Sequence, residues 1–245
     1  MSIESIQHDA VPLQVARPDR PVTVAMIVLH QAPGYSPQIA SWLTRLADHG
    51  YLAVAPMLLH RHGVEHVNPM QRFAGDLTAF AAWLPGDEDV LADVDSTLGF
   101  LGAAGIAVGK TGILGFSYGG RAAYLSAAER PLGAAITFYG NGIQRKSFHG
   151  NDRIPALTDR MKSLRTPWLG LYGDQDPLLT EGELDEWQAQ LPDAPVTAEL
   201  IRYPEAGHAF DVIESPVPGM PPRYVAAAAE DATDRTLRFL AATLH

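Results

Sequence analysis

A serine surrounded by glycines is the residue best placed to do chemistry in this sequence. Ser117 is the middle residue of GFSYG (115–119), which fits the pattern Gly-x-Ser-x-Gly. The stretch ends an apolar run at 111–116 and begins an amphipathic run at 118–130. In that context the pattern is typical of a sharp strand-to-helix turn that exposes a nucleophilic hydroxyl. Glycines flank the serine because side chains two positions away would collide with the turn.

A serine nucleophile needs a histidine base, which in turn needs an orienting carboxylate. The chain order expected with this turn is serine, then the acid, then histidine. The histidines downstream of the serine are His149, His208 and His245. His245 is the last residue, where chains fray, and His149 lies in a polar loop. His208 follows the last apolar run directly, in YPEAGHAF, so we predict that His208 is the base.

The acid is expected in LYGDQDPLLT, which contains Asp174 and Asp176. Asp176 lies further beyond the predicted strand, where its side chain can turn toward an imidazole. Asp174 is better suited to capping the turn through its own backbone. Asp211 is a third candidate, but it lies very close in sequence to His208. We therefore predict Asp176 as the acid.

An acyl-transfer site also needs hydrogen-bond donors for the developing oxyanion. One donor is expected from the backbone N–H of Tyr118, at the beginning of the helix that follows the nucleophile. The second should come from the loop after the apolar run 22–30. Pro33 has no N–H in that loop, so Ala32 is the natural candidate.

The elements that must position these residues alternate along the chain. Apolar runs typical of buried strands occur at 22–30, 51–56, 111–116, 133–140, 167–174 and 197–204. Amphipathic segments that predict helices occur at 37–50, 93–105, 118–130 and 221–245. This alternation predicts an α/β fold with a mainly parallel sheet and helices on both faces, in one domain spanning 1–245. The first residues, SIQHDAVPLQVARP (5–18), are expected to add an antiparallel pair.

Composition narrows the class of protein further. Apolar residues make up 47% of the chain and charged residues 19%, and the net charge is −10. Such a charge argues against nucleic acid and anionic membrane partners. The absence of cysteine excludes disulfides and a thiol nucleophile. The run Val22 to Leu29 is too short for a membrane helix, and no secretory signal is visible. We expect a cytoplasmic protein without a cofactor, and the sequence leaves monomer and homodimer open.

Five segments together resemble the dienelactone hydrolase family, a branch of the α/β-hydrolase superfamily without a large lid. They are IVLHQAPGYSPQIASWLTRLADHGYLAVAPMLL, GFSYGG, TFYGNGI, GDQDPLL and YPEAGHAF. The resemblance covers residues 22–245 in order and spacing. It implies a triad that maps to Ser117, Asp176 and His208, with oxyanion donors that map to Ala32 and Tyr118.

The sequence departs from the family pattern at three positions. The family's usual nucleophile is cysteine, where this chain has Ser117, and its usual glutamate is replaced by Gln31. A serine does not rest ionised, so a neutral residue at position 31 suffices near the oxyanion loop. An arginine that binds a substrate carboxylate is replaced by Val212. The resemblance therefore implies a serine esterase that prefers a neutral ester or lactone, unless Arg72, Arg202 or Arg223 restores the carboxylate clamp.

Side chains near the predicted strand ends could line a substrate pocket. We expect substrate contacts from Gln31, Phe73, Tyr118 and Tyr139, with Trp83 and Phe148 as further aromatic candidates. Two alternatives to the serine hydrolase remain. One is a metal-dependent hydrolase that uses the histidines of HRHGVEH, His60, His62 and His66. The other is a binding protein of the same fold without catalytic activity.

Overall fold

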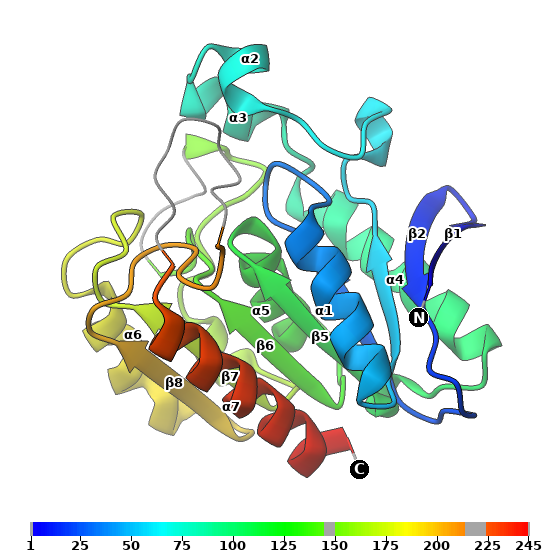
Figure 1. The fold of residues 1–245 in the computed structure, drawn as a ribbon. Helices are drawn as coiled ribbons and strands as arrows, with labels where there is room; N and C mark the ends of the chain where they lie inside the picture. The colour runs from blue at the N-terminus through cyan, green and yellow to red at the C-terminus, as the bar shows by residue number, and fades with distance from the viewer. Residues whose placement is uncertain (1, 145–149, 214–223, 245) are drawn as a thin grey trace.

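The computed structural model describes residues 2–144, 150–213 and 224–244. Its strands form one eight-stranded sheet in the order β1-β2-β4-β3-β5-β6-β7-β8 (Figure 1). The strands are β1 (Ile3–His8), β2 (Val11–Ala16), β3 (Ala25–Leu29), β4 (Leu52–Pro56), β5 (Thr111–Phe116), β6 (Ala134–Phe138), β7 (Trp168–Gly173) and β8 (Ala198–Tyr203).

Strands β3 to β8 run parallel to one another. Strand β2 pairs antiparallel with both β1 and β4 at one edge. The predicted mainly parallel sheet is confirmed, as is the antiparallel pair formed by the first residues. The central strands β3, β5, β6 and β7 are buried along their whole length, which explains why they read as continuous apolar runs.

Helices cover both faces of the sheet (Figure 1). One face packs against α1 and α7, and the other packs against α4, α5 and α6. The helices are α1 (Pro37–Asp48), α2 (Pro69–Phe73), α3 (Leu77–Trp83), α4 (Asp87–Ala103), α5 (Tyr118–Glu129), α6 (Glu183–Gln190) and α7 (Ala226–Leu244). Short 3₁₀ turns occur at His60–His62, Val108–Lys110, Arg160–Ser163 and Leu191–Asp193.

Helix α1 shows why the sequence specifies these layers. Ile39, Leu43 and Leu46 recur at helical spacing, and all three side chains are fully buried against the sheet. Pro37 fits the first helical position because its missing N–H would have no partner there. Gly50 follows the helix with φ 92°, a conformation that glycine adopts without strain.

Several elements differ from the sequence-based expectation. Helix α4 begins at Asp87 rather than 93, because its first turn carries three acidic residues that favour a helix N-terminus. Helices α2, α3 and α6 were not predicted, since each is shorter than nine residues. Helices α2 and α3 stand beyond the carboxyl ends of the strands (Figure 1), and with five and seven residues they make a small cap there.

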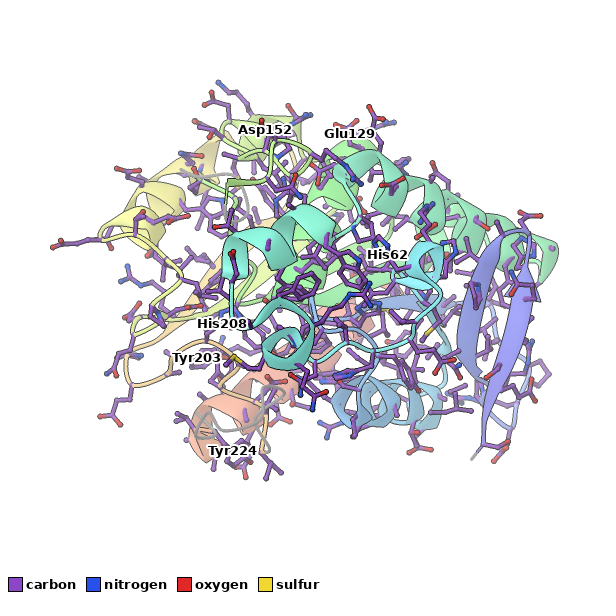
Figure 2. All side chains as sticks on the ribbon, turned by 90° about the horizontal axis from the view of Figure 1, so that it is seen from above. His62, Glu129, Asp152, Tyr203, His208 and Tyr224 are labelled. Carbon is purple, nitrogen blue, oxygen red and sulfur yellow. The ribbon has the colours of Figure 1, made fainter. Side chains whose placement is uncertain are left out.

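The carboxyl ends of the parallel strands gather the loops that carry the predicted chemistry. Figure 2 looks down on the molecule from above and labels His208, which follows β8. Ser117 follows β5 and Asp176 lies three residues beyond β7. Open parallel sheets bind their ligands at this edge.

Candidate active site

Ser117 forms the corner between β5 and α5. Its backbone has φ 53° and ψ −116°, a conformation that is strained for a residue with a side chain. The corner is held from both sides, since the Ser117 N–H donates to the Phe138 carbonyl at 3.0 Å and the Ser117 carbonyl accepts from the Arg121 N–H at 2.9 Å. The neighbouring strand β6 and the helix α5 therefore fix the strained turn.

Two glycines of the motif are required by close backbone approach. A Cβ atom at position 115 would lie 2.0 Å from the carbonyl oxygen of Gly119. A Cβ atom at position 119 would lie 2.4 Å from the carbonyl oxygen of Leu29, at the end of β3. Any larger residue would push α5 away from the sheet and move the Ser117 hydroxyl.

A chain of hydrogen bonds joins Ser117 to His208 and Asp176. The Ser117 Oγ lies 2.9 Å from Nε2 of His208, and Nδ1 of His208 lies 2.8 Å from Oδ2 of Asp176. In the tautomer that satisfies both contacts, Nδ1–H donates to the carboxylate and Nε2 accepts from the serine hydroxyl. The Asp176 side chain is fully buried, whereas 17% of the imidazole remains exposed. The structure thus brings the three predicted residues together.

The other acid candidates have different partners. Asp174 accepts from Nε of Arg202 at 2.6 Å, so its side chain forms a partly exposed ion pair instead of the expected turn cap. Arg202 also pairs with Asp185, so its guanidinium is committed to protein carboxylates and does not offer a substrate clamp. Asp176 is fixed further by the Leu178 N–H, which donates to its Oδ1 at 2.9 Å.

The proposed oxyanion donors come from two elements that touch. Ala32 lies in the loop after β3 and is 6% exposed, and Tyr118 is the first residue of α5. The N–H groups of a first helical turn point along the helix axis, toward the corner where Ser117 lies. The close contact of Gly119 with the end of β3 fixes the position of α5 relative to the loop that carries Ala32, and so the positions of the two N–H groups relative to each other.

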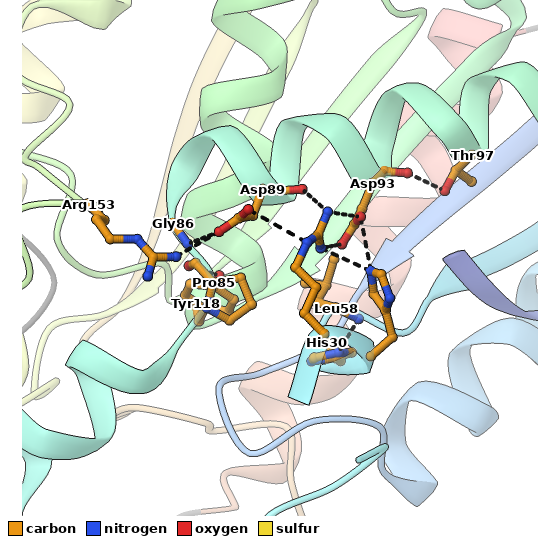
Figure 3. Close-up of polar contacts among 11 residues, drawn as sticks. His30, Leu58, Pro85, Gly86, Asp89, Asp93, Thr97, Tyr118 and Arg153 are labelled. Carbon is orange, nitrogen blue, oxygen red and sulfur yellow. Dashed lines mark hydrogen bonds and ion pairs between the residues drawn. The ribbon is translucent and has the colours of Figure 1, made fainter. Parts of the chain in front are cut away.

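The side chains of Tyr118 and Tyr139, two of the expected substrate contacts, are buried in the protein. The Tyr118 phenol is 2% exposed and donates to the Pro85 carbonyl at 2.6 Å (Figure 3). The Tyr139 ring is fully buried and donates to Oδ1 of Asp211 at 2.6 Å. A side chain that water cannot reach is also out of reach of a substrate, so both phenols make their hydrogen bonds inside the protein. Burial raises the pKa of each phenol.

A polar network lies next to the His208 ring. Gln31 donates from Nε2 to Oε1 of Gln38 at 2.7 Å, and Gln38 donates to Oδ2 of Asp211 at 2.7 Å. The Tyr139 ring meets the His208 ring edge to face, with centroids 5.0 Å apart. Burial raises the pKa of Asp211 even though Tyr139 and Gln38 donate to the carboxylate. The sequence pattern pointed to Asp211 and Gln31 separately, but no spacing rule predicts their connection through Gln38, because the two residues lie so far apart in the chain.

The aromatic side chains of the cap pack on one another. Phe73 lies 5.3 Å from Phe80 and 5.5 Å from Trp83, ring centre to ring centre. Arg72 lies over the Trp83 ring at 4.9 Å. Phe73 is half-buried and stays a candidate for substrate contact. His149, His245, Phe148 and Arg223 lie outside the described residues.

The histidines of HRHGVEH have separate partners. His60 contacts the buried carboxylate of Asp93 at 3.3 Å, and the His62 ring stacks on Trp83 at 4.0 Å. In the part of the chain that the structure describes, no group of three His, Asp or Glu side chains is arranged to hold a metal ion. The metal-hydrolase alternative therefore finds no ligand set there. Nor does any described helix have the length and hydropathy to cross a membrane.

Known proteins resemble this chain over most of its length. The family model described as "Dienelactone hydrolase family" matches residues 11–244. A protein named "Putative carboxymethylenebutenolidase" from Escherichia coli (strain K12) is 36% identical over 238 residues, covering 95% of this chain and 83% of that protein. A protein of the same name from Yersinia pestis is 34% identical over 237 residues, covering 94% and 83%.

A solved structure is also similar over nearly its whole length. The crystal structure of a "Putative Dienelactone Hydrolase" from Klebsiella pneumoniae subsp. pneumoniae MGH 78578 superimposes with a TM-score of 0.79 and 30% identity, covering 98% of this chain and 99% of that one. The sheet order, the strand-to-helix corner and this likeness define an α/β-hydrolase fold. Within that class, the chain belongs to the dienelactone hydrolase family.

Proposed function

We propose that this protein is a serine hydrolase that cleaves a small carboxylic ester or lactone through an acyl-enzyme intermediate. The observation that supports the proposal is the chain of hydrogen bonds, 2.9 and 2.8 Å long, that joins Ser117 Oγ, the His208 ring and the Asp176 carboxylate. A corner serine, a histidine and a buried acid in this chain order form the constellation that performs acyl transfer.

The chemistry follows from the geometry. Ser117 Oγ attacks the carbonyl carbon as Nε2 of His208 takes its proton, and Asp176 stabilises the imidazolium that forms. The backbone N–H groups of Ala32 and Tyr118 stabilise the oxyanion. His208 then gives the proton to the leaving alkoxide. Water, activated by the same imidazole, attacks the acyl-enzyme and releases the acid and Ser117.

The charge at the site favours a neutral substrate. The similar proteins named carboxymethylenebutenolidase point to a lactone as substrate. An anionic lactone would need a cation, but Arg202 is paired with Asp174 and Asp185, and position 212 is valine. Of the other two arginines considered, Arg72 lies over the Trp83 ring, and Arg223 lies outside the described residues. We therefore favour a neutral butenolide or small ester over a substrate that carries a carboxylate.

The test compares Ser117→Ala with Ser126→Ala, a serine inside α5 whose hydroxyl donates to the Ala122 carbonyl. Ser117→Ala should abolish turnover of p-nitrophenyl acetate and labelling by a fluorophosphonate, and Ser126→Ala should keep both. A neutral butenolide and its carboxymethylene analogue then test the substrate class. Turnover by Ser117→Ala close to that of the wild-type protein would contradict the mechanism, and faster turnover of the anionic lactone would contradict the substrate class.

A further inference from the structure

His30 is a fully buried polar residue at the end of β3 that the triad does not use. It lies between an apolar strand and the loop that carries Ala32. An imidazole in such a place must have its hydrogen bonds satisfied by the protein, because water does not reach it. Its partners therefore show what it does.

The two ring nitrogens bind two different loops. The Leu58 N–H donates to Nε2 of His30 at 3.1 Å, as Figure 3 shows. Because that nitrogen accepts, the ring proton of the neutral imidazole lies on Nδ1. Nδ1 is 2.7 Å from the Gln31 carbonyl oxygen and donates to it. Burial lowers the pKa of His30 to about 4, so this neutral tautomer persists at ordinary pH.

The carbonyl that His30 holds belongs to the same peptide group as the N–H of Ala32. A trans peptide is planar, and its N–H points away from its C=O. The Gln31 oxygen also accepts from the Gly34 N–H at 2.9 Å. Two donors on one side of the peptide thus fix its plane, and with it the direction of the Ala32 N–H on the other side.

The loop that carries Leu58 is anchored in turn to α4. The guanidinium of Arg61 binds Asp93 through two contacts of 2.7 and 2.8 Å, and the Asp93 side chain is fully buried. The 3₁₀ turn His60–His62 is therefore tied to the helix that packs on the sheet. This anchor gives the backbone of residue 58 a fixed position from which to hold the imidazole.

We propose that His30 is a positioning residue for the oxyanion hole: by donating to the Gln31 carbonyl, it aims the Ala32 N–H at the oxyanion formed on attack by Ser117. The proposal rests on the proposed function, because the direction of this N–H matters only if the site forms a tetrahedral intermediate. A purely structural role is the alternative. It would require only that the two hydrogen bonds hold the loops together.

Two substitutions test the hydrogen bonds of the two ring nitrogens of His30 one at a time. His30→Asn places an amide near the position of Nδ1, so it can still donate to the Gln31 carbonyl. His30→Gln places its amide near the position of Nε2, where the oxygen can still accept from the Leu58 N–H. Both variants lose one buried hydrogen bond and should lose similar thermal stability. They differ in which loop they release.

The expected kinetic result is a split between the two variants. His30→Gln should lower kcat for p-nitrophenyl acetate about 10- to 100-fold with KM within about twofold, since loss of an oxyanion donor costs about 100- to 1,000-fold and misalignment costs less. His30→Asn should stay within about fivefold of the wild-type kcat. A trifluoromethyl ketone, which forms a tetrahedral adduct with the serine, should bind more weakly to His30→Gln by the factor seen in kcat/KM.

Leu240→Ala is the control for stability, since Leu240 is fully buried on α7 and truncation there costs about 2–5 kcal/mol. It should lower the melting temperature and leave kcat unchanged. Wild-type kcat in folded His30→Gln, or an equal loss in both His30 variants, would overturn the positioning role. A wild-type protein without Ser117-dependent turnover would instead overturn the proposed function, and the positioning role with it.

Discussion

Acidification should weaken this fold through one buried imidazole. His30 is expected to bind a proton at about pH 6.5 in the unfolded chain and only at about pH 4 in the folded protein, because burial lowers its pKa. Between these values the unfolded state binds more protons than the folded state, so acid stabilises the unfolded state. Stability contributed by the neutral ring is complete above about pH 6.5, falls as the pH falls, and is lost below about pH 4.

The size of the effect follows from the two pKa values. A difference of about 2.5 pKa units corresponds to about 3 kcal/mol, at 1.36 kcal/mol for each unit. About 2 kcal/mol of this should already be lost between pH 7 and pH 5. Asp211 acts in the opposite direction, because its raised pKa lets the folded state bind a proton more readily as the pH falls. The net curve of the wild-type protein therefore mixes both groups.

Comparison of the wild-type protein with His30→Gln isolates the imidazole. Urea unfolding followed by tryptophan fluorescence gives the free energy of unfolding at each pH, and groups common to both proteins cancel. The wild-type advantage should shrink by about 2 kcal/mol from pH 7 to pH 5 and by about 3 kcal/mol at pH 4. Parallel curves across this range would refute the reasoning, since they would mean that His30 takes up its proton in the folded protein as it does in the unfolded chain.

Two further changes test the packing around the site. Gly119→Ala should lower kcat/KM at least tenfold, because its Cβ would meet the Leu29 carbonyl oxygen at 2.4 Å, whereas Gly109→Ala, with nothing within 4 Å, should be neutral in the same assay. Tyr139→Phe removes a hydrogen-bond donor from the buried Asp211 carboxylate and should cost about 1–3 kcal/mol of stability at pH 7. Without that donor the pKa of Asp211 rises further, so thermal unfolding at pH 5 should show a smaller loss of stability. An undiminished loss at pH 5 would contradict that account.

Strand ends were the part of the site that the sequence predicted best. Ser117, Asp176 and His208 each follow an apolar run, and parallel strands bring such positions to one edge whatever their separation along the chain. Hydrophobic patterning and chain order therefore predicted which strand ends would meet and that His208 would lie there. The choice of Asp176 over Asp174 needed a second reason, because both aspartates follow the same apolar run, and that reason was how far each lies beyond the strand.

Partners of individual side chains could not be predicted in the same way. Asp174 pairs with Arg202 across neighbouring strands, and the Tyr118 phenol reaches the Pro85 carbonyl in a distant loop. These contacts depend on the relative placement of loops, which no local pattern encodes. The short helices α2 and α3 were missed for a related reason, since five and seven residues show too few turns for a periodic signal.

The neutral residue at position 31 has a physical explanation in the network next to the His208 ring. Gln38 uses its amide nitrogen for Asp211 and Tyr139, so only its oxygen is left to meet residue 31. The Gln31 amide supplies the donor that this oxygen needs. A glutamate at this position, which the family pattern would place there, would set a carboxylate against that oxygen and add a second charge near the buried Asp211. The proposed serine nucleophile, which is neutral at rest, and the neutral Gln31 thus satisfy the same electrostatic requirement: the buried carboxylates of Asp176 and Asp211 gain no further negative charge beside them.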